Sequence, residues 1–334
     1  MILSKGNLTI ENLLFNNKKD LIPLKKGGDG IFKSGRNGVK RIFTTKDQKV
    51  DYICFENEKI IAFVKSQMGY PAMYPFLPVK IDSPIKAVLM DLDGTSVESE
   101  EFWVWIIEQT TSKLLRNPKF KLEESDLPFV SGHSVSEHLN YCIKKYCPEK
   151  TIEEARKCYF EITNYEMKTI LEGRGRIDAF KPTDGLKDFL LALKDKKIKI
   201  GLVTSGLYEK AWPEIYAAFK QLKMGDPRYF YDAIITAGYT IRKGTAGTLG
   251  ELEPKPHPWL YAETARIGLG IDFKDRHHVI GIEDSGAGIV SIRLAGFTAI
   301  GMADGNIIES GTLPFCSSYC KKLTQVLEII RNFQ

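Results

Sequence analysis

The chain has no long uninterrupted run of apolar residues. No apolar stretch among its 334 residues approaches the roughly 18 needed for a membrane-spanning helix. The opening segment, residues 1–7, also lacks the long apolar core of a secretion signal. We therefore expect a cytoplasmic protein that has no membrane partner.

Cysteine is sparse and lacks the spacing of a metal site. The six cysteines include no Cys-x-x-Cys pair and no accompanying histidine cluster. The nearby pairs Cys142/Cys147 and Cys316/Cys320 are expected to be small buried apolar residues rather than zinc ligands. Unpaired cysteines in this number fit a reducing compartment.

No strongly basic segment is present either. The net charge is +5, and residues 1–80 hold 14 basic and 7 acidic residues against 33 and 35 in the remainder. Basic residues are nowhere interleaved with aromatic ones as in a base-stacking surface. We expect a solvated basic face in the N-terminal part and no nucleic-acid partner.

The most informative feature is a pair of acids that directly follows an apolar run. Residues 85–90 read as a buried strand, and Asp91, Asp93, Gly94 and Thr95 follow it. A strand that ends there delivers Asp91 to the sheet edge where α/β folds bind ligands, and Gly94 allows a sharp turn. Two acids this close favour a metal-assisted site with one nucleophilic and one proton-transferring carboxylate. The alternative is a solvated Asp-x-Asp-Gly turn.

Three later segments also place polar groups at strand ends or in stiff loops. The apolar run 198–203 ends at Thr204, Ser205 and Gly206, a hydroxyl followed by N–H groups that suit an anion. Prolines flank Lys255 within residues 253–258 and fix it as a point charge. A third apolar run, 279–282, ends in paired acids, Glu283 and Asp284.

The order of these patterns predicts an α/β fold in three regions. Residues 98–180 read as helical, with capping boxes at 134–137 and 151–154. Residues 84–97 and 181–334 are expected to form the catalytic core, because alternating helix and strand patterns specify a parallel sheet with covering helices. The alternating segments are 186–196, 198–203, 207–222, 233–236, 259–267 and 279–282.

Residues 1–83 form an N-terminal extension of no assigned role. Two strand-like runs, 51–55 and 59–64, flank a turn candidate at Asn57. Prolines between 71 and 84 are interpreted as the passage into the core. By default this region packs against the core or pairs subunits.

Together the motifs resemble the haloacid dehalogenase superfamily of phosphohydrolases over roughly residues 84–303. Its four motifs occur in order as Asp91-x-Asp93-Gly-Thr, Thr204, Lys255 and Glu283-Asp284. The longer matches around them resemble the group with a helical cap, which includes β-phosphoglucomutase and phosphoglycolate phosphatase. The resemblance implies a Rossmann-like sheet with the α-helical cap inserted after the first motif.

The resemblance also implies roles for individual residues. Asp91 would be the nucleophile that forms an aspartyl-phosphate, and Asp93 the general acid and base. Thr204, with Ser205 and Gly206 beside it, would hold phosphate oxygens, and Lys255 would offset negative charge. Mg²⁺, which prefers oxygen ligands, would be bound by Asp91, the backbone carbonyl of Asp93, Glu283 and Asp284. Asp284 is the stronger candidate for a direct ligand, and Glu283 for one acting through water.

The expected activity is Mg²⁺-dependent hydrolysis of a small phosphorylated metabolite. Asp93 disfavours carbon–halogen cleavage, since family members with that activity lack an acid at this position. A phosphomutase is the first alternative, but the mutase's lid histidine and arginine align with Trp103 and Val135. A non-catalytic phosphate-binding regulator is the other alternative, against which both Asp91 and Asp93 argue.

Several lid and loop residues are candidates for substrate contact. On the lid these are Phe102, Trp103, Trp105 and His133, although aromatic residues on a lid helix are more often part of its core. The Gly/Thr-rich stretch 240–250 is interpreted as a surface loop. The alternative is an additional pocket rim in which Arg242 or Lys243 faces an acidic substrate.

Overall fold

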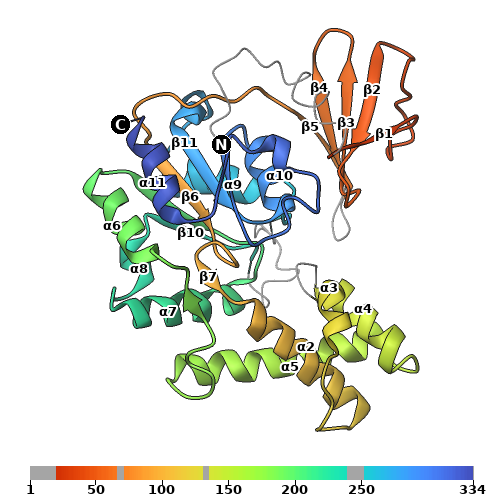
Figure 1. Cartoon of the computed structure of the whole chain (residues 1–334), viewed down its shortest axis with the longest axis vertical. Helices are drawn as coiled ribbons and strands as arrows, with labels where there is room; N and C mark the ends of the chain where they lie inside the picture. The colour runs from red at the N-terminus through yellow and green to blue at the C-terminus, as the bar shows by residue number, and fades with distance from the viewer. Residues whose placement is uncertain (1–19, 66–70, 131–134, 239–251, 334) are drawn as a thin grey trace, which may run out of the picture.

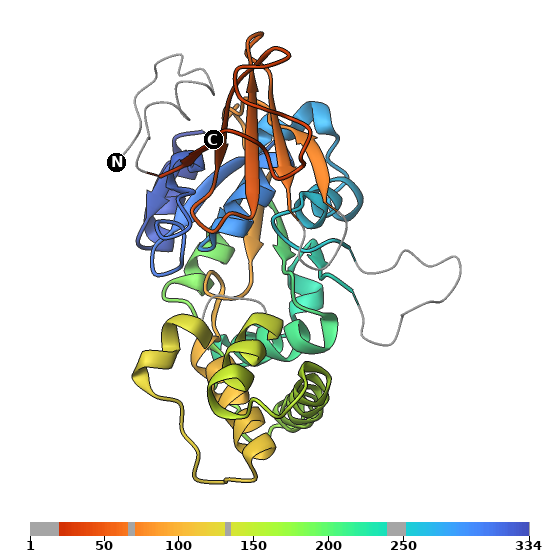
Figure 2. The same ribbon diagram turned by 90° about the vertical axis from the view of Figure 1, so that its right-hand side faces the viewer.

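The structure is a computed structural model that describes residues 20–65, 71–130, 135–238 and 252–333. It has three parts: an α/β core, a group of helices at one end, and a separate antiparallel sheet beside the core (Figure 1). Figure 2 shows the helical group below the carboxyl ends of the core strands. No helix within the described ranges is long and apolar enough to cross a membrane.

The core is a six-stranded parallel sheet in the order β10-β9-β6-β11-β12-β13. Its four inner strands are almost wholly buried and mostly apolar, as expected of a parallel sheet covered on both faces, and the two outermost strands are half-buried. They are β6 (Ala87–Asp91), β9 (Lys199–Val203), β10 (Ala233–Ile235), β11 (Val279–Glu283), β12 (Thr298–Met302) and β13 (Ser318–Cys320). The expected α/β parallel sheet is confirmed.

Helices cover both faces of this sheet. On one face lie α6 (Leu186–Asp195), α7 (Tyr208–Leu222) and α11 (Leu323–Arg331), whose apolar residues share a core with Val88 and Met90. On the other lie α9 (Trp259–Glu263) and α10 (Gly286–Leu294), which pack against Ala87 and Leu89. The helix expected over 259–267 is α-helical only as far as Glu263 and continues as a π-helix over Thr264–Gly268.

The inserted helices are α2 (Glu100–Leu115), α3 (Leu127–Val130), α4 (Val135–Tyr146) and α5 (Ile152–Leu171). At the start of α5 the expected capping box is present: the Glu154 amide donates to Thr151 Oγ1 over 3.2 Å, and the Thr151 amide donates to Glu154 Oε2 over 2.9 Å. The two connections to the core pair as short antiparallel strands, β7 (Val97–Glu98) and β8 (Lys181–Pro182). These helices form the cap.

The N-terminal region is a five-stranded antiparallel sheet, β1 to β5 in chain order. One of its faces carries Tyr52, Ala62 and Val64, which share an apolar core with α9 and α10. Of the two default expectations for this region, the structure therefore shows packing against the core. The strands are β1 (Ile22–Leu24), β2 (Val39–Thr44), β3 (Val50–Phe55), β4 (Ile60–Val64) and β5 (Ala72–Pro75).

The last of these strands corrects part of the sequence interpretation. Of the proline-rich stretch interpreted as a passage into the core, residues 72–75 pair with β4, and residues 76–86 connect that strand to β6. Proline has no backbone N–H to donate, which an edge strand such as β5 tolerates and a central strand does not.

Candidate active site

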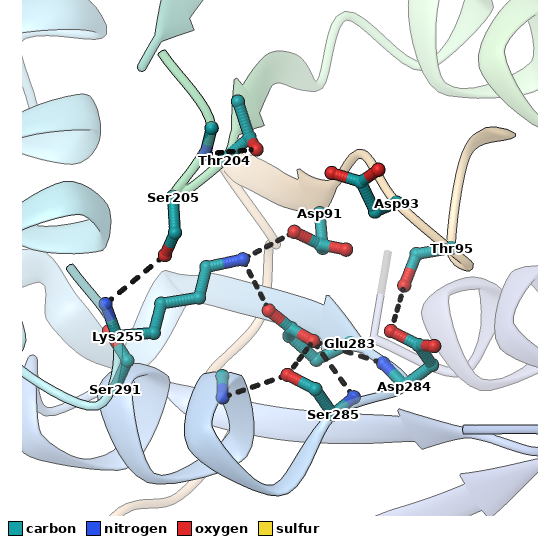
Figure 3. Close-up of polar contacts among 12 residues, drawn as sticks. Asp91, Asp93, Thr95, Thr204, Ser205, Lys255, Glu283, Asp284, Ser285 and Ser291 are labelled. Atoms are coloured by element: carbon teal, nitrogen blue, oxygen red, sulfur yellow. Dashed lines mark hydrogen bonds and ion pairs between the residues drawn. The ribbon is translucent and has the colours of Figure 1, made fainter. Parts of the chain in front are cut away.

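Three carboxylates meet at the carboxyl ends of two neighbouring core strands. Asp91 is the last residue of β6, and Glu283 is the last of β11, with Ile282 in register opposite Met90. With Asp284 they offer oxygens that all lie within 4.8 Å of one another. Figure 3 shows these side chains converging on one space. We call Asp91, Glu283 and Asp284 the acid cluster.

Lys255 reaches into this cluster from a loop that precedes α9. Its Nζ forms ion pairs with Asp91 Oδ1 and Glu283 Oε1, and only 7% of its side chain is exposed. Burial acts to lower the pKa of Lys255, but the two carboxylates outweigh it and raise the pKa above its ordinary value. The lysine therefore stays charged within the site.

Negative charge exceeds positive charge in the acid cluster. Burial and then the charge of Glu283 raise the pKa of Asp91 well above its ordinary range. The same two causes raise the pKa of Asp284 to about 8. When Asp91, Glu283 and the half-buried Asp284 are all ionised, one lysine leaves an excess of negative charge that a divalent cation would neutralise. A donor set made only of carboxylate oxygens fits Mg²⁺.

Thr204, Ser205 and Gly206 follow β9, which is the neighbour of β6 on its other side. Thr204 is buried, and its Oγ1 accepts a 2.9 Å hydrogen bond from the Gly206 amide. Ser205 Oγ accepts from the backbone amide of Lys255 over 3.2 Å. The structure thus brings all three to the edge that carries Asp91, and it shows Ser205 holding the lysine loop (Figure 3).

Asp93 has partners that differ from those of the acid cluster. Ser99 Oγ donates to Asp93 Oδ1 over 2.6 Å, and Lys210 Nζ lies 3.4 Å from the same oxygen. Burial acts to raise the pKa of Asp93, but Lys210 and the hydrogen bond from Ser99 outweigh it and the net shift is downward. The carboxylate of Asp93 is therefore held ionised and oriented by Ser99, at the start of α2, and by Lys210 on α7.

The comparison with known families agrees with this geometry. The sequence profile of the haloacid dehalogenase-like hydrolases matches residues 85–296, which is more than half of the chain. The chain belongs to the haloacid dehalogenase-like hydrolase family. It is therefore an enzyme of that family, and the matched span contains all of the active-site residues described above.

Individual proteins to which the chain is similar carry phosphomutase and phosphatase names. The β-phosphoglucomutase of Bacillus subtilis is 27% identical over 234 residues, which span 66% of this chain and 84% of that protein. A solved structure described as a predicted phosphoglycolate phosphatase from Haemophilus somnus aligns with a TM-score of 0.54 at 18% identity. That alignment covers 74% of this chain and 98% of that one.

A further similar structure is that of CbbY from Rhodobacter sphaeroides, solved in complex with xylulose-1,5-bisphosphate. It aligns with a TM-score of 0.51 at 18% identity and covers 72% of this chain and 96% of that one. At such identity the structural matches show the fold of this haloacid dehalogenase-like hydrolase. The five-stranded N-terminal sheet lies outside the span that the family profile matches.

In this haloacid dehalogenase-like hydrolase, both carboxylate oxygens of Glu283 already accept hydrogen bonds from other groups of the protein. Its Oε2 accepts from the Asp284 amide, the Ser285 amide and Ser285 Oγ over 2.9–3.1 Å. Its Oε1 contacts Lys255 and accepts from the Tyr261 hydroxyl over 3.1 Å. This supports Asp91 and Asp284 as the direct ligands for a cation and Glu283 as the residue that orients the lysine.

The turn after β6 depends on Gly94, whose φ of 78° suits glycine. A Cβ built on Gly94 would lie 2.2 Å from Asp284 Oδ2, so a side chain here would displace that carboxylate. Thr95 Oγ1 donates to Asp284 Oδ1 over 3.3 Å from the same turn. The Asp-x-Asp-Gly-Thr motif therefore supplies Asp91 and Asp93 and also positions Asp284, which lies far along the chain.

Sequence reasoning missed Ser99, Lys210 and Glu214. Lys210 Nζ lies 3.4 Å from Asp93 and 3.9 Å from Glu214, which is fully buried. Burial and then the charge of Asp93 raise the pKa of Glu214 well above its ordinary value. Glu214 could have indicated this group from the sequence, because it is an acid among the buried apolar positions of α7 and follows Lys210 by four residues.

The aromatic candidates on the cap have different surroundings. Phe102 is buried and packs on Phe180 with ring centroids 4.7 Å apart, so it belongs to the cap's core. The half-buried ring of Trp103 lies 4.1 Å below Lys210 Nζ, which places it next to the partners of Asp93. Trp105 faces a surface depression between α2 and α5, lined by residues outside the acid cluster.

Three further candidates, His133, Arg242 and Lys243, lie outside the described residues.

Proposed function

We propose that this chain is a Mg²⁺-dependent phosphatase that hydrolyses a small phosphorylated metabolite through an aspartyl-phosphate. One observation carries the proposal: Lys255 bridges Asp91 and Glu283 inside a cluster of carboxylates that could hold a cation. A lysine and a divalent cation are what a transferring phosphoryl group needs, because catalysis of that reaction is mostly positioning and charge neutralisation.

In the first step, an oxygen of Asp91 attacks the phosphorus and the bond to the leaving oxygen breaks. Asp93 gives its proton to that leaving oxygen. Thr204 and neighbouring N–H groups hold phosphate oxygens, and Lys255 offsets the charge shared by Asp91 and the phosphoryl group. When bound by Asp91, Asp284 and the backbone carbonyl of Asp93, Mg²⁺ supplies further neutralisation and orients the phosphate.

In the second step, Asp93 takes a proton from water, and the resulting hydroxide attacks the phosphorus of the aspartyl-phosphate. The products are inorganic phosphate and regenerated Asp91. Lys210 and Ser99 favour the ionised Asp93 that this step requires. The dianionic phosphate of a bound substrate opposes ionisation of Asp93. Bound substrate therefore favours the protonated Asp93 that the first step requires.

A phosphomutase is the second candidate, since one relative is a β-phosphoglucomutase. A mutase must hold the second phosphate of a bisphosphorylated intermediate, which requires a cation on the cap side of the site. Trp103 and Val135 stand where the mutase resemblance requires a histidine and an arginine. Lys210 is a nearby cation, but it is engaged by Asp93 and Glu214. Both observations favour hydrolysis.

The test is a screen of phosphorylated metabolites in which released phosphate is measured with Mg²⁺ and with excess chelator. We expect release that depends on Mg²⁺ for at least one small phosphate ester. An isomerised sugar phosphate with no free phosphate would establish the mutase instead. Absence of turnover on every metabolite and on aryl phosphates would favour the non-catalytic regulator.

Replacing Lys210 with methionine is expected to lower kcat about tenfold, the range of one charge-assisted hydrogen bond. The change removes the cation that directs Asp93 and that lies 3.9 Å from the buried Glu214. Lys210→Arg keeps the charge and is the matched control. Steady-state kinetics and thermal unfolding of both variants check this prediction, and a Lys210→Met variant with wild-type kcat would contradict it.

A further inference from the structure

The N-terminal sheet touches the loop that carries Lys255. Tyr74 lies on β5, the strand at the edge of that sheet. Its hydroxyl is 2.8 Å from Nδ1 of His257, which lies 183 positions later in the chain. The Tyr74 ring also meets the His257 and Trp259 rings edge-on, at centroid distances of 5.8 Å and 6.2 Å. A segment outside the family match therefore contacts a residue two positions from the buried lysine.

The partners of His257 hold it in one orientation. Its side chain is 2% exposed, and burial lowers the pKa of the imidazole, so the ring is neutral. A neutral ring has one acceptor and one donor nitrogen. When the Tyr74 hydroxyl donates to Nδ1, the proton is on Nε2, which faces Glu253 Oε2 at 3.9 Å. The backbone carbonyl of His257 accepts from Ser291 Oγ of α10 over 2.6 Å.

Because the loop is stiff, holding His257 in place also holds Lys255 in place. Prolines at 254, 256 and 258 fix the backbone on both sides of Lys255 and His257. The His257 amide donates to the Pro254 carbonyl over 3.0 Å, which closes the loop around the lysine. With the Lys255 amide held by Ser205, the loop is fastened to the end of β9, to α10 and to the N-terminal sheet.

We propose that the N-terminal sheet positions the catalytic lysine, with Tyr74 acting through His257 as a positioning residue. This inference rests on the proposed function, in which Lys255 offsets charge on the transferring phosphoryl group. It assigns the appended sheet a task in the reaction in addition to its packing against the core. Tyr74 touches no substrate atom in this account, so its effect is expected on turnover rather than on substrate affinity.

The test compares wild type with Tyr74→Phe, which removes the hydroxyl and keeps the ring contacts. With p-nitrophenyl phosphate and Mg²⁺, kcat is expected to fall about three- to tenfold, the range of one neutral hydrogen bond, with KM unchanged. The matched control is Tyr231→Phe, which changes a buried tyrosine whose hydroxyl, unlike that of Tyr74, has no hydrogen-bond partner among the described residues. Its kcat is expected to equal that of wild type.

A double-mutant cycle distinguishes positioning through His257 from general destabilisation. His257→Leu should lower kcat at least as much as Tyr74→Phe, and adding Tyr74→Phe to it should lower kcat no further. His257→Asn, which offers a polar atom near the position of Nδ1, should recover part of the loss. Equal losses from Tyr74→Phe in both backgrounds, or no loss in the wild-type background, would overturn the inference.

Binding of inorganic phosphate in the presence of Mg²⁺, measured by calorimetry, separates this inference from the proposed function. If wild type binds phosphate without turning over any ester, the phosphatase proposal fails. In a protein that only binds phosphate, Lys255 acts in binding, so the positioning role then predicts phosphate affinity that is about threefold or more weaker in Tyr74→Phe than in Tyr231→Phe. Equal affinities in that case would overturn it. A wild-type protein that neither binds phosphate nor releases it would overturn both.

Discussion

Replacing Asp91 with asparagine is expected to abolish turnover, with kcat reduced on the order of 10⁴-fold or more, as for other covalent nucleophiles. Asparagine has nearly the same shape, so it fits at the end of β6. Its amide cannot attack phosphorus as a carboxylate does. The substitution also removes one of the three charges of the acid cluster, where burial already disfavours an ionised Asp91.

The fold should survive this substitution. Losing the ion pair with Lys255 is offset by removing a carboxylate whose ionisation the site disfavours, so the melting temperature should stay within a few degrees of wild type. Asp272→Asn, at a side chain that is 73% exposed, is the matched control and should keep full activity. Kinetics together with thermal unfolding check this prediction. Appreciable turnover by a well-folded Asp91→Asn protein would exclude the covalent route.

Replacing Asp93 with asparagine is expected to lower kcat/KM for alkyl phosphates by about 10²- to 10⁴-fold, the usual contribution of a general acid. Asparagine can still accept the hydrogen bond that Ser99 donates to Oδ1, so geometry is largely kept while proton transfer is lost. Because an acidic phenol leaves without protonation, the loss should be much smaller for aryl phosphates with good leaving groups.

The measurement is kcat/KM for a series of phosphate esters that differ in the pKa of the leaving alcohol. This quantity reports the steps up to formation of the aspartyl-phosphate, so it isolates the acid role of Asp93 from its later role as a base. Ser99→Ala, which removes only the hydrogen bond to Asp93, should show the same trend with a smaller slope. A loss that is uniform across the series would contradict the assignment of Asp93 as the general acid.

The core could be predicted from sequence because its signals are local and repeated. Each buried strand is a short apolar run, and in a parallel sheet such runs must end at one edge. The acids that follow β6 and β11 and the threonine that follows β9 are therefore brought together by topology alone. The resemblance to the family then placed Lys255, whose loop has no strand to locate it.

What sequence reasoning missed depends on contacts between distant segments. The ion pair of Lys210 with Asp93 joins α7 to the turn after β6 across 117 positions. The hydrogen bond between Tyr74 and His257 spans a greater separation, and β5 is a four-residue strand ending in proline. No periodicity marks such pairs. Only the buried acid at Glu214 left a readable signal, because a charged residue interrupts the apolar face of α7.

The central claim is that Asp91 carries the phosphoryl group between substrate and water, and direct trapping of that group tests it. The Asp93→Asn variant should accumulate the intermediate, because it lacks the base that activates water. After mixing with an aryl phosphate and Mg²⁺, acid quench, proteolysis and mass spectrometry should locate one phosphate on the peptide that contains Asp91. Stoichiometric release of phosphate in the first turnover, with no covalent phosphate on that peptide, would contradict the account.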